Sequence, residues 1–489
     1  IVLMSLLTPA DSAVKHVWAT TGPRYLINTV ALAAMVAFGA GAIGSSAAAI
    51  VSIAEFPGRR ALSLGLALPL AVPAYIAAYA YGDMFGPFGA ASALFRGAPP
   101  DIKSLPGAAF ILTLATYPYV YLAARASFDA RSGALLEAAR TLGASPQRFF
   151  VSVLAPTGRA AIAGGVALAL METVADYGVA DYLGVPTLSV GIFRTWRGLG
   201  DLNAAVQLAG GLLLVALLLV MIEEGSRRGL GAESARAHRS PARVRLGPLG
   251  SALAAAFCGI PILLGFIAPA ATLLARLLDG QGIARGLVVA AGNTALIATI
   301  GAALAIAIAG ALAISSRGPK APLGRALARI ATLGYALPGA VVALSIVAAA
   351  GFFKVGLAAG YATLLYAYAV RFSTAGFNAV DGALKQIHPL TEEAARMLGA
   401  GLPRIIRRLF LPAARPAVIA GGLVVFIDIC RELPATLLLR PFNFETLATE
   451  VYRLASDERL SEAAPAALLL IALSIVPVFL VNALGNLRR

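Results

Sequence analysis

The sequence predicts an all-α membrane protein made of two parallel repeats of a six-helix bundle, on three observations. The first is composition, because 59% of the 489 residues are hydrophobic and only 13% are charged, as is typical of a chain that lies in lipid. The second is a series of apolar stretches that are long enough to cross a bilayer. The third is a polar sequence pattern that recurs after 256 residues, once in each half.

Eleven apolar stretches are expected to form membrane helices, because a span needs about 20 apolar residues. They lie near residues 27–50, 61–81, 107–124, 161–180 and 206–222 in the first half, and near 251–277, 288–314, 327–350, 357–378, 416–433 and 465–484 in the second. A twelfth partner is the apolar segment 1–8, which is too short to span. We therefore expect the sequence to begin inside its first membrane helix, which is truncated.

The basic residues predict which ends of these helices face the cytoplasm. Of the 39 Lys and Arg residues, 26 lie in one alternate set of segments, and the positive-inside rule makes that set cytoplasmic. This topology explains the net charge of +15 without a nucleic-acid partner. The set consists of 51–61, 124–162, 223–250, 315–329, 371–415 and the C-terminus. We expect membrane domains at 1–225 and 251–489, joined by a basic cytoplasmic linker at 226–250.

The recurring polar pattern predicts a short helix followed by a turn in both halves. A Glu-Ala-Ala start suits a helix, because these residues are good helix formers and the acid lies near the positive end of the helix dipole. A glycine then ends the helix, and a later proline marks a turn into the next membrane helix. The copies are Glu137, Ala138, Ala139, Gly143 and Pro156, and Glu393, Ala394, Ala395, Gly399 and Pro412. Duplication in register favours docking of a soluble partner over a plain loop.

This pattern resembles the coupling loop of the membrane permeases of ATP-binding-cassette importers, and the surrounding spans resemble their type I transmembrane domain. The resemblance implies that both copies contact a cytoplasmic ATPase, present twice, which binds ATP and Mg²⁺. It also implies a multi-pass protein of the bacterial inner membrane. The loop from Arg125 to Glu137 is ten residues shorter than that from Arg371 to Glu393, so the two docking sites need not be equivalent.

The chain itself is expected to be no enzyme and to bind no cofactor. None of its five lysines follows a glycine, so it has no P-loop for nucleotide. Its three histidines are scattered through loops, and no HExxH or GxSxG motif occurs. The ATPase must therefore be a separate polypeptide.

Acids in the membrane helices form the candidate translocation path. Glu172 and Asp176 lie four residues apart and share a helix face, and Asp428 and Glu432 repeat them after 256 residues. Such acids by default suggest function, and their oxygens, with those of Tyr177, suit a hard cation. The hypothesis is that Glu172, Asp176, Asp428 and Glu432 bind ferric iron transiently as it passes. The alternative is that they are helix-end acids, with Asp428 or Glu432 neutralised by Arg431.

A narrower resemblance points to the substrate. Residues 431–449 resemble the characteristic segment of fused ferric-iron permeases, and 175–184 resemble its counterpart in the first half. This implies a periplasmic binding protein that delivers Fe(III) to the outer face, where segments 181–205 and 431–464 carry charges that suit docking. Thiamine permeases of the same build remain an alternative. A carrier driven by an ion gradient is another, although its repeats are often inverted rather than parallel.

Overall fold

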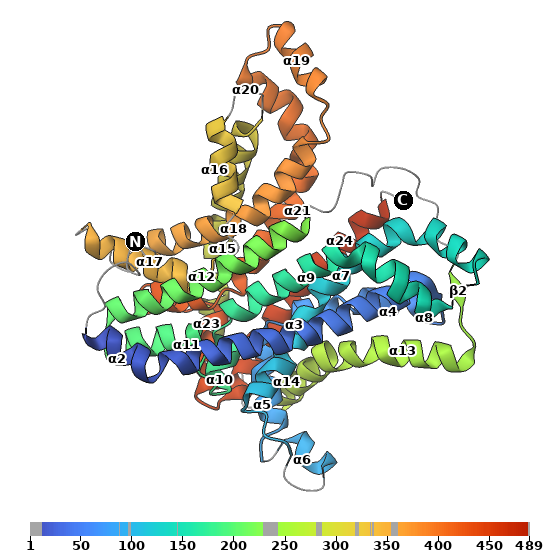
Figure 1. The fold of residues 1–489 in the computed structure, drawn as a ribbon. Coiled ribbons are helices and arrows are strands. Elements are labelled where there is room, and N and C mark those ends of the chain that lie inside the picture. Colours follow the sequence, from blue (N-terminus) through green and yellow to red (C-terminus); the bar gives the residue numbers. More distant parts are fainter. Residues whose placement is uncertain are drawn as a thin grey trace. The chain divides into compact units, whose positions relative to one another are not determined.

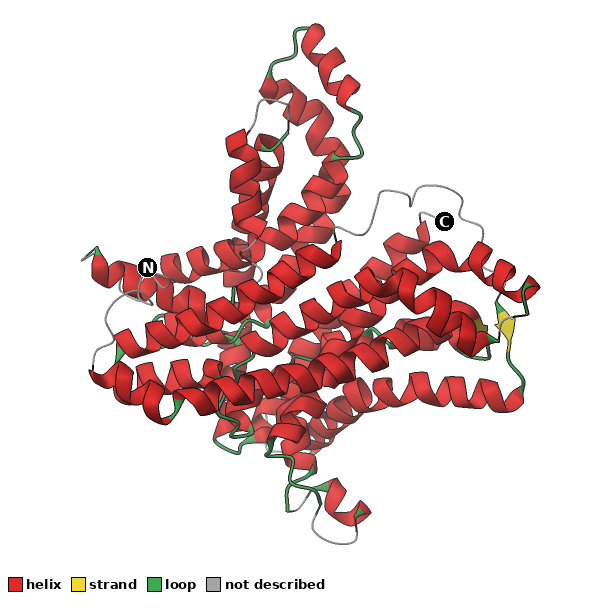
Figure 2. Ribbon diagram, viewed as in Figure 1, coloured by secondary structure: helices red, strands yellow, loops and turns green. Residues whose placement is uncertain are grey.

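The computed structural model describes residues 12–87, 89–95, 99–143, 145–227, 243–279, 286–317, 322–332, 334, 337–353 and 360–487. The apolar segment 1–8 and most of the predicted linker lie outside them. Figure 2 shows that the described chain is almost entirely helical, which confirms the predicted fold class. The two strands among the described residues, β1 (Ala54–Glu55) and β2 (Val244–Arg245), are two residues long and pair in parallel.

The chain packs into two compact units. The first unit consists of residues 2–283 and 451–478, and the second mainly of residues 284–450. The boundary at 450–451 falls inside helix α23 (Leu447–Ser456), and α24 (Leu460–Leu487) extends from the first unit. The predicted division into domains 1–225 and 251–489 stays a prediction.

The first unit is centred on three long helices that pack side by side, α3 (Gly22–Ile53), α7 (Leu105–Thr141) and α9 (Ala155–Ala175) (Figure 1). Glycines allow the close approach, as is common in lipid. A Cβ at Gly44 would lie 2.7 Å from Val120 Cβ, and a Cβ at Gly165 would lie 2.6 Å from Val120 Cα. The other elements of this unit are α2 (Ser12–Thr20), α4 (Arg59–Gly65), η1 (Leu68–Ala71), α5 (Ala74–Met84), α6 (Ala90–Leu94), α8 (Pro146–Phe149), η2 (Phe150–Leu154), α10 (Gly178–Tyr182), α11 (Leu188–Phe193), η3 (Arg194–Gly198), α12 (Leu202–Arg227), α13 (Pro248–Ile262), η4 (Leu263–Ile267) and α14 (Ala268–Leu278).

The second unit has an equivalent core of α15 (Leu287–Ser315), α18 (Tyr361–Leu384) and α21 (Leu411–Cys430). α7 and α18 begin 256 residues apart, as do α9 and α21, so the sequence repeat is also a structural repeat. The remaining elements are α16 (Pro322–Thr332), α17 (Gly339–Phe352), α19 (Pro389–Met397), α20 (Leu402–Ile405), η6 (Ile406–Phe410) and α22 (Pro434–Leu439).

Most predicted spans are present. Seven helices among the described residues are long and apolar enough to cross a membrane, and α18 and α24 cover two more predicted stretches. These seven are Gly22–Ile53, Leu105–Asp129, Ser152–Ala175, Leu202–Ile222, Pro248–Leu278, Leu287–Ser315 and Leu402–Cys430.

Two predicted spans are not single straight helices. The stretch 61–81 bends by 92° between η1 and α5, and α16 ends at Thr332 before α17 begins at Gly339. In each half a proline with an extended ψ stands before the next helix, Pro73 at 135° and Pro338 at 138°. Hydropathy missed both breaks, because proline is compatible with an apolar window although it lacks a helical N–H and disfavours helical geometry in the residue before it.

Candidate functional site

The first Glu-Ala-Ala copy does not start a helix, contrary to the prediction. Glu137, Ala138 and Ala139 lie near the end of α7, which runs without interruption from Leu105 to Thr141. In the second copy α18 ends and a separate helix, α19, begins at Pro389, four residues before Glu393. The residue equivalent to Pro389 is Gly133, so the first copy lacks the proline that interrupts the second. The side chains of Glu137 and Ala138 lie outside the described residues.

The predicted glycine turns are confirmed in both copies. Gly143 has φ +71° and Gly399 has φ +76°, and a Cβ would meet no atom within 4 Å at either position. The glycines are therefore required by the left-handed backbone rather than by crowding. After α19, Gly399 N–H donates to Arg396 O and Ala400 N–H donates to Ala395 O. These two bonds form a Schellman motif that ends the helix.

The second copy presents an exposed surface. Glu393, Ala394 and Gly399 are exposed, and Met397 and Leu398 are 90% and 86% exposed. The equivalent of Leu398 in the first copy is Leu142, which is also 86% exposed. Large exposed apolar side chains beside polar ones are a mark of an interaction surface.

A residue that the sequence analysis missed, Glu392, anchors α19 to its own unit. Its carboxylate accepts a hydrogen bond from Arg396 at 2.9 Å and lies 3.5 Å from Arg317 Nε. Arg317 also donates to Leu384 O at 2.7 Å and lies over the Phe410 ring at 5.1 Å. The four-residue spacing from Glu392 to Arg396 is a helical pair visible in the sequence, whereas Arg317 is too distant in the chain to be found that way.

The predicted turns at Pro156 and Pro412 are wrong. The helix is continuous through both positions, because α8, η2 and α9 follow one another without a break, as do α20, η6 and α21. Each proline is the second residue after a π-helical turn. A wider π turn accommodates a residue without an N–H and its ring. Phe149, which precedes one of these π-helical turns, and Phe410, which ends the other, are buried at 1% and 2% exposure.

Two of the four predicted path acids cap short helices. Asp176 ends α9, and its Oδ1 accepts hydrogen bonds from Val179 N at 2.9 Å and Ala180 N at 3.4 Å. Glu432 follows α21, and its Oε1 and Oε2 accept from Ala435 N at 3.0 Å and Thr436 N at 2.9 Å. Both acids therefore stabilise the first turn of the next helix, α10 or α22.

The acids of the second unit are paired with arginines. Arg371 donates to Glu432 Oε1 at 2.8 Å, where the side chains are 14% and 1% exposed. Arg431 donates to Asp428 at 2.5 Å. Arg431 thus pairs with Asp428, which agrees with the alternative that these residues are helix-end acids neutralised by Arg431. Glu432 pairs instead with Arg371, which lies 61 residues earlier in the chain.

The predicted meeting of four carboxylates stays a prediction. Glu172 and Asp176 belong to the first unit, whereas Asp428 and Glu432 belong to the second. Within the described part of the chain, no three His, Cys, Asp or Glu side chains are grouped so that they could hold a metal ion. Glu172 and Asp428 are only partly buried.

Tyr177 lies in a hydrogen-bonded group that the sequence analysis found only in part. Its ring stacks on Phe193 at 3.8 Å, and its hydroxyl contacts Asp181 at 3.1 Å and the Tyr452 hydroxyl at 2.9 Å. Burial, followed by the charge of Asp181, raises the pKa of Tyr452 to about 12. At neutral pH Tyr452 is therefore a protonated donor.

Comparison with known proteins identifies the class of protein. Residues 301–488 match the family described as binding-protein-dependent transport system inner membrane component. The second half of the chain therefore belongs to the permeases of the binding-protein-dependent importers. The chain is 26% identical to the Fe(3+)-transport system permease protein FbpB 2 of Haemophilus influenzae over 94% of this chain and 89% of that protein.

Two further relatives of the permease are informative. It is 25% identical to a probable ABC transporter permease protein, y4fN, of Sinorhizobium fredii, over 86% of this chain and 80% of that one. A probable molybdenum ABC transporter permease protein of Haloferax volcanii is 33% identical over 22% of this chain and 39% of its own length. Membership of this class makes the permease a multi-pass inner-membrane protein that works with a binding protein and an ATPase.

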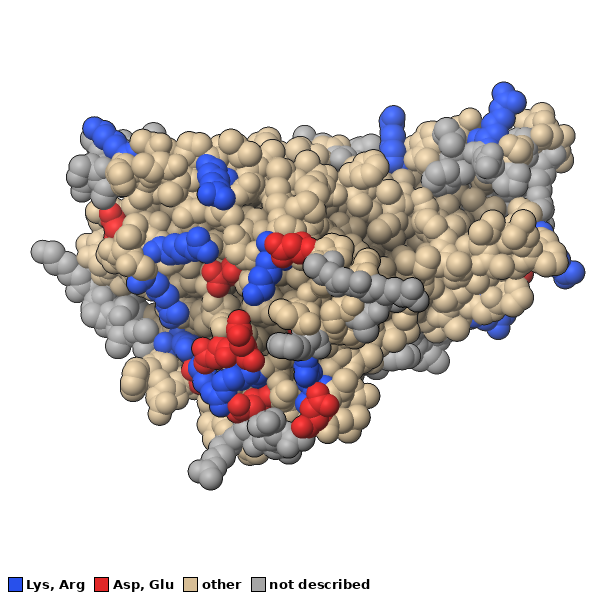
Figure 3. Space-filling model, turned by 90° about the horizontal axis from the view of Figure 1, so that it is seen from below, with Lys and Arg blue, Asp and Glu red and all other residues tan. Residues whose placement is uncertain are grey.

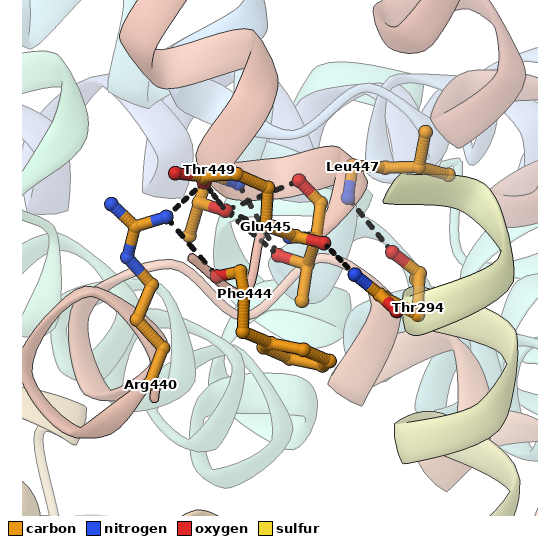
Figure 4. A network of polar contacts seen from close by, with 8 residues as sticks. Thr294, Arg440, Phe444, Glu445, Leu447 and Thr449 are labelled. Atoms are coloured by element: carbon orange, nitrogen blue, oxygen red, sulfur yellow. Dashed lines mark hydrogen bonds and ion pairs between the residues drawn. The ribbon is translucent and has the colours of Figure 1, made fainter. Parts of the chain in front are cut away.

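Within the matched region of the permease, residues 440–449 are joined to α15 by hydrogen bonds (Figure 4). Arg440 forms an ion pair with Glu445, whose backbone carbonyl accepts from Asn293 at 2.9 Å. Thr294 Oγ1 accepts from Leu447 N at 2.8 Å. Residues 440–449 of the predicted outer segment are therefore held against the second unit, and Arg440 is paired within that unit.

Charged side chains of both signs gather on one part of the face seen in Figure 3, whereas much of the rest of that face is uncharged. Pairs of opposite charge in the first unit include Arg276 with Asp83 at 2.8 Å and Arg459 with Glu462 at 2.6 Å. The side-chain hydrogen bond from Arg459 is the main reason that the pKa of Glu462 is lowered.

Proposed function

We propose that this permease moves ferric iron into the cytoplasm, driven by ATP hydrolysis on two copies of a separate ATPase subunit. The observation that carries the substrate is the similarity to an Fe(3+)-transport permease along 94% of this chain. A periplasmic binding protein delivers the ion. ATP and Mg²⁺ bind to the ATPase, and the permease contributes no cofactor of its own.

The two Glu-Ala-Ala segments are the proposed ATPase contacts. The support is their duplication, the exposed second copy around Glu393 and Gly399, and the apolar side chains of Leu142 and Leu398 that stand out from the turns. The basic segments that contain them are proposed to be cytoplasmic. A cysteine in place of the exposed Thr391 should react with an impermeant reagent only from the cytoplasmic side. Reaction from the periplasm would contradict this orientation.

Glu172, Asp176, Tyr177, Asp428 and Glu432 are proposed to line the translocation path. Glu172 and Asp428 are the better candidates for contact with the ion, because Asp176 and Glu432 are engaged in capping. Asp428, by contrast, caps no helix among the described residues and is paired there only with the nearby Arg431. Replacing Glu172 and Asp428 together by Ala should reduce uptake without reducing the amount of protein in the membrane. Unchanged uptake would remove these two acids from the path.

Transport by the reconstituted system tests the substrate. Permease, ATPase and binding protein are placed in lipid vesicles, and uptake of radioactive ferric iron is compared with that of thiamine and molybdate. We expect ATP-dependent, vanadate-sensitive accumulation of iron alone. Accumulation of thiamine or molybdate instead would replace the substrate, and uptake driven by an ion gradient without ATP would overturn the proposed class.

A further inference from the structure

We propose that Tyr177, Asp181 and Tyr452 form an acceptor site that binds ferric iron through two phenolate oxygens and one carboxylate oxygen. The site rests on the proposed function, because iron is the substrate that it would receive. All three residues belong to the first unit. Tyr177 directly follows Asp176 in the chain, so the site adjoins the proposed path.

The spacing of the three oxygens fits one face of a metal octahedron. The Tyr452 hydroxyl lies 2.7 Å from Asp181 Oδ2, the Tyr177 hydroxyl lies 3.1 Å from the same oxygen, and the two hydroxyls are 2.9 Å apart. Oxygen ligands about 2.0–2.1 Å from a small hard cation in octahedral geometry are about 2.9 Å from their neighbours. The group can therefore bind such a cation with little rearrangement.

A third tyrosine, on the adjoining helix α5, has a hydroxyl that lacks a hydrogen bond within the described chain. The Tyr79 hydroxyl is buried and has no hydrogen-bond partner among the described residues, and the residue is 1% exposed. Its ring packs edge-on against Tyr182 at 4.6 Å, the residue that follows Asp181 in the chain. A buried polar group without a partner is costly and requires an explanation, and a bound cation supplies one.

The group is also held in place and reachable. Stacking of Tyr177 on Phe193 at 3.8 Å fixes its ring, while Asp181 and Tyr452 are partly exposed. Tyr177 directly precedes α10, Asp181 lies in α10 and Tyr452 lies in α23. α10 packs against α5, which carries Tyr79. The oxygen ligands are therefore already positioned, and two of them are partly exposed. Such a site suits the transfer of an ion better than its permanent storage.

Binding requires no change in the oxidation state of iron. Each phenol releases its proton to water as its oxygen bonds to Fe(III), and the Asp181 carboxylate binds without a proton. Oxygen donors of this kind are the ligands that hard cations prefer. The alternative is that these three side chains only join α10 to α23 by hydrogen bonds and bind no metal ion.

Optical titration separates these two cases, because a phenolate bound to Fe(III) absorbs visible light. The purified complex of permease and ATPase is titrated with ferric nitrilotriacetate. We expect a visible band with the unaltered chain, and a loss of affinity of about tenfold or more with Tyr452→Phe and with Asp181→Asn. Tyr361→Phe is the matched control, because Tyr361 is 54% exposed and belongs to the second unit; it should leave the band unchanged.

The outcomes distinguish this site from the proposed function. If the unaltered complex transports iron but shows no band, or if Tyr452→Phe and Asp181→Asn keep both band and affinity, the acceptor site is wrong while iron transport stands. If the band is present and lost in these variants but vesicles accumulate no iron, the site stands as a ferric site and the transport proposal fails. Elution of each variant as an intact complex confirms that it has folded.

Discussion

Asp176 and Glu432, which are 256 residues apart, make the same contact: each carboxylate accepts hydrogen bonds from the backbone N–H groups three and four residues ahead. Only for Glu432 does the structure give an arginine partner, Arg371 at 2.8 Å. The repeat has therefore kept a cap in both halves and an ion pair in the second, so the two halves are expected to respond differently to loss of the acid.

Glu432→Ala should be strongly destabilising. The change leaves Arg371 largely buried without its carboxylate and removes the cap of α22, so we expect a loss of about 3–5 kcal/mol. Asp381→Ala is the control, because its partner Lys385 is 74% exposed and such pairs contribute about 0–1 kcal/mol. Thermal unfolding in detergent measures both. Similar small losses would show that the buried pair is not important for stability.

Adjacent glycines in α9 should differ sharply in their tolerance of alanine. A Cβ at Gly165 would lie 2.6 Å from Val120 Cα, which is backbone, whereas a Cβ at Gly164 would meet nothing within 4 Å. We expect Gly165→Ala to cost about 1–3 kcal/mol through crowding of α7 and α9. Gly164→Ala should be neutral or stabilising by up to about 1 kcal/mol. Equal melting temperatures for the two variants would contradict this packing.

Gly399→Ala should impair coupling. An alanine at φ +76° costs about 1–2 kcal/mol and distorts the turn after α19. We expect less iron uptake per ATP hydrolysed in vesicles. Gly401→Ala is the control, because the backbone there has φ −69° and the nearest atom to a Cβ is 3.9 Å away. Normal coupling in Gly399→Ala would show that this turn does not transmit the effect of ATP.

Tyr81→Phe should loosen the contact between α5 and the π-helical turn η4. The Tyr81 hydroxyl donates to Leu264 O at 2.6 Å, and a hydrogen bond between membrane helices contributes about 0.6–2 kcal/mol. Tyr366→Phe should have no effect, because Tyr366 is 60% exposed. Thermal unfolding in detergent compares the stability of the two variants. An equal loss of stability in both would show that the hydrogen bond to Leu264 O is not the cause.

The sequence predicted the spans and the repeat well, because both depend on local signals. Apolar length predicted α3, α15 and most other spans, and the register of the polar pattern predicted the turns at Gly143 and Gly399. It did not predict the breaks before α5 and α17, because an apolar window does not register the loss of a helical N–H at Pro73 or Pro338.

The candidate site was harder to predict, because its contacts join distant parts of the chain. Arg371 and Glu432 are 61 residues apart, and Tyr177 and Tyr452 are 275 apart. Pairs that meet only through folding leave no periodic signal in the sequence, in contrast to Glu392 and Arg396, which lie one helical turn apart. The capping role of Asp176 and Glu432 likewise depends on where α9 and α21 end.

The helix from Leu402 to Cys430 is continuous over its 29 residues, and at 1.5 Å per residue it is about 43 Å long. One of its ends follows the turn at Gly399, and the other leads directly to Asp428 and Glu432. If the turn at Gly399 contacts the ATPase, as proposed, a displacement of that turn reaches Asp428 through one continuous helix rather than through a loop. The π-helical turn at residues 406–410 and the internal Pro416 are the points at which this helix would bend, so they decide how much of that displacement reaches Asp428.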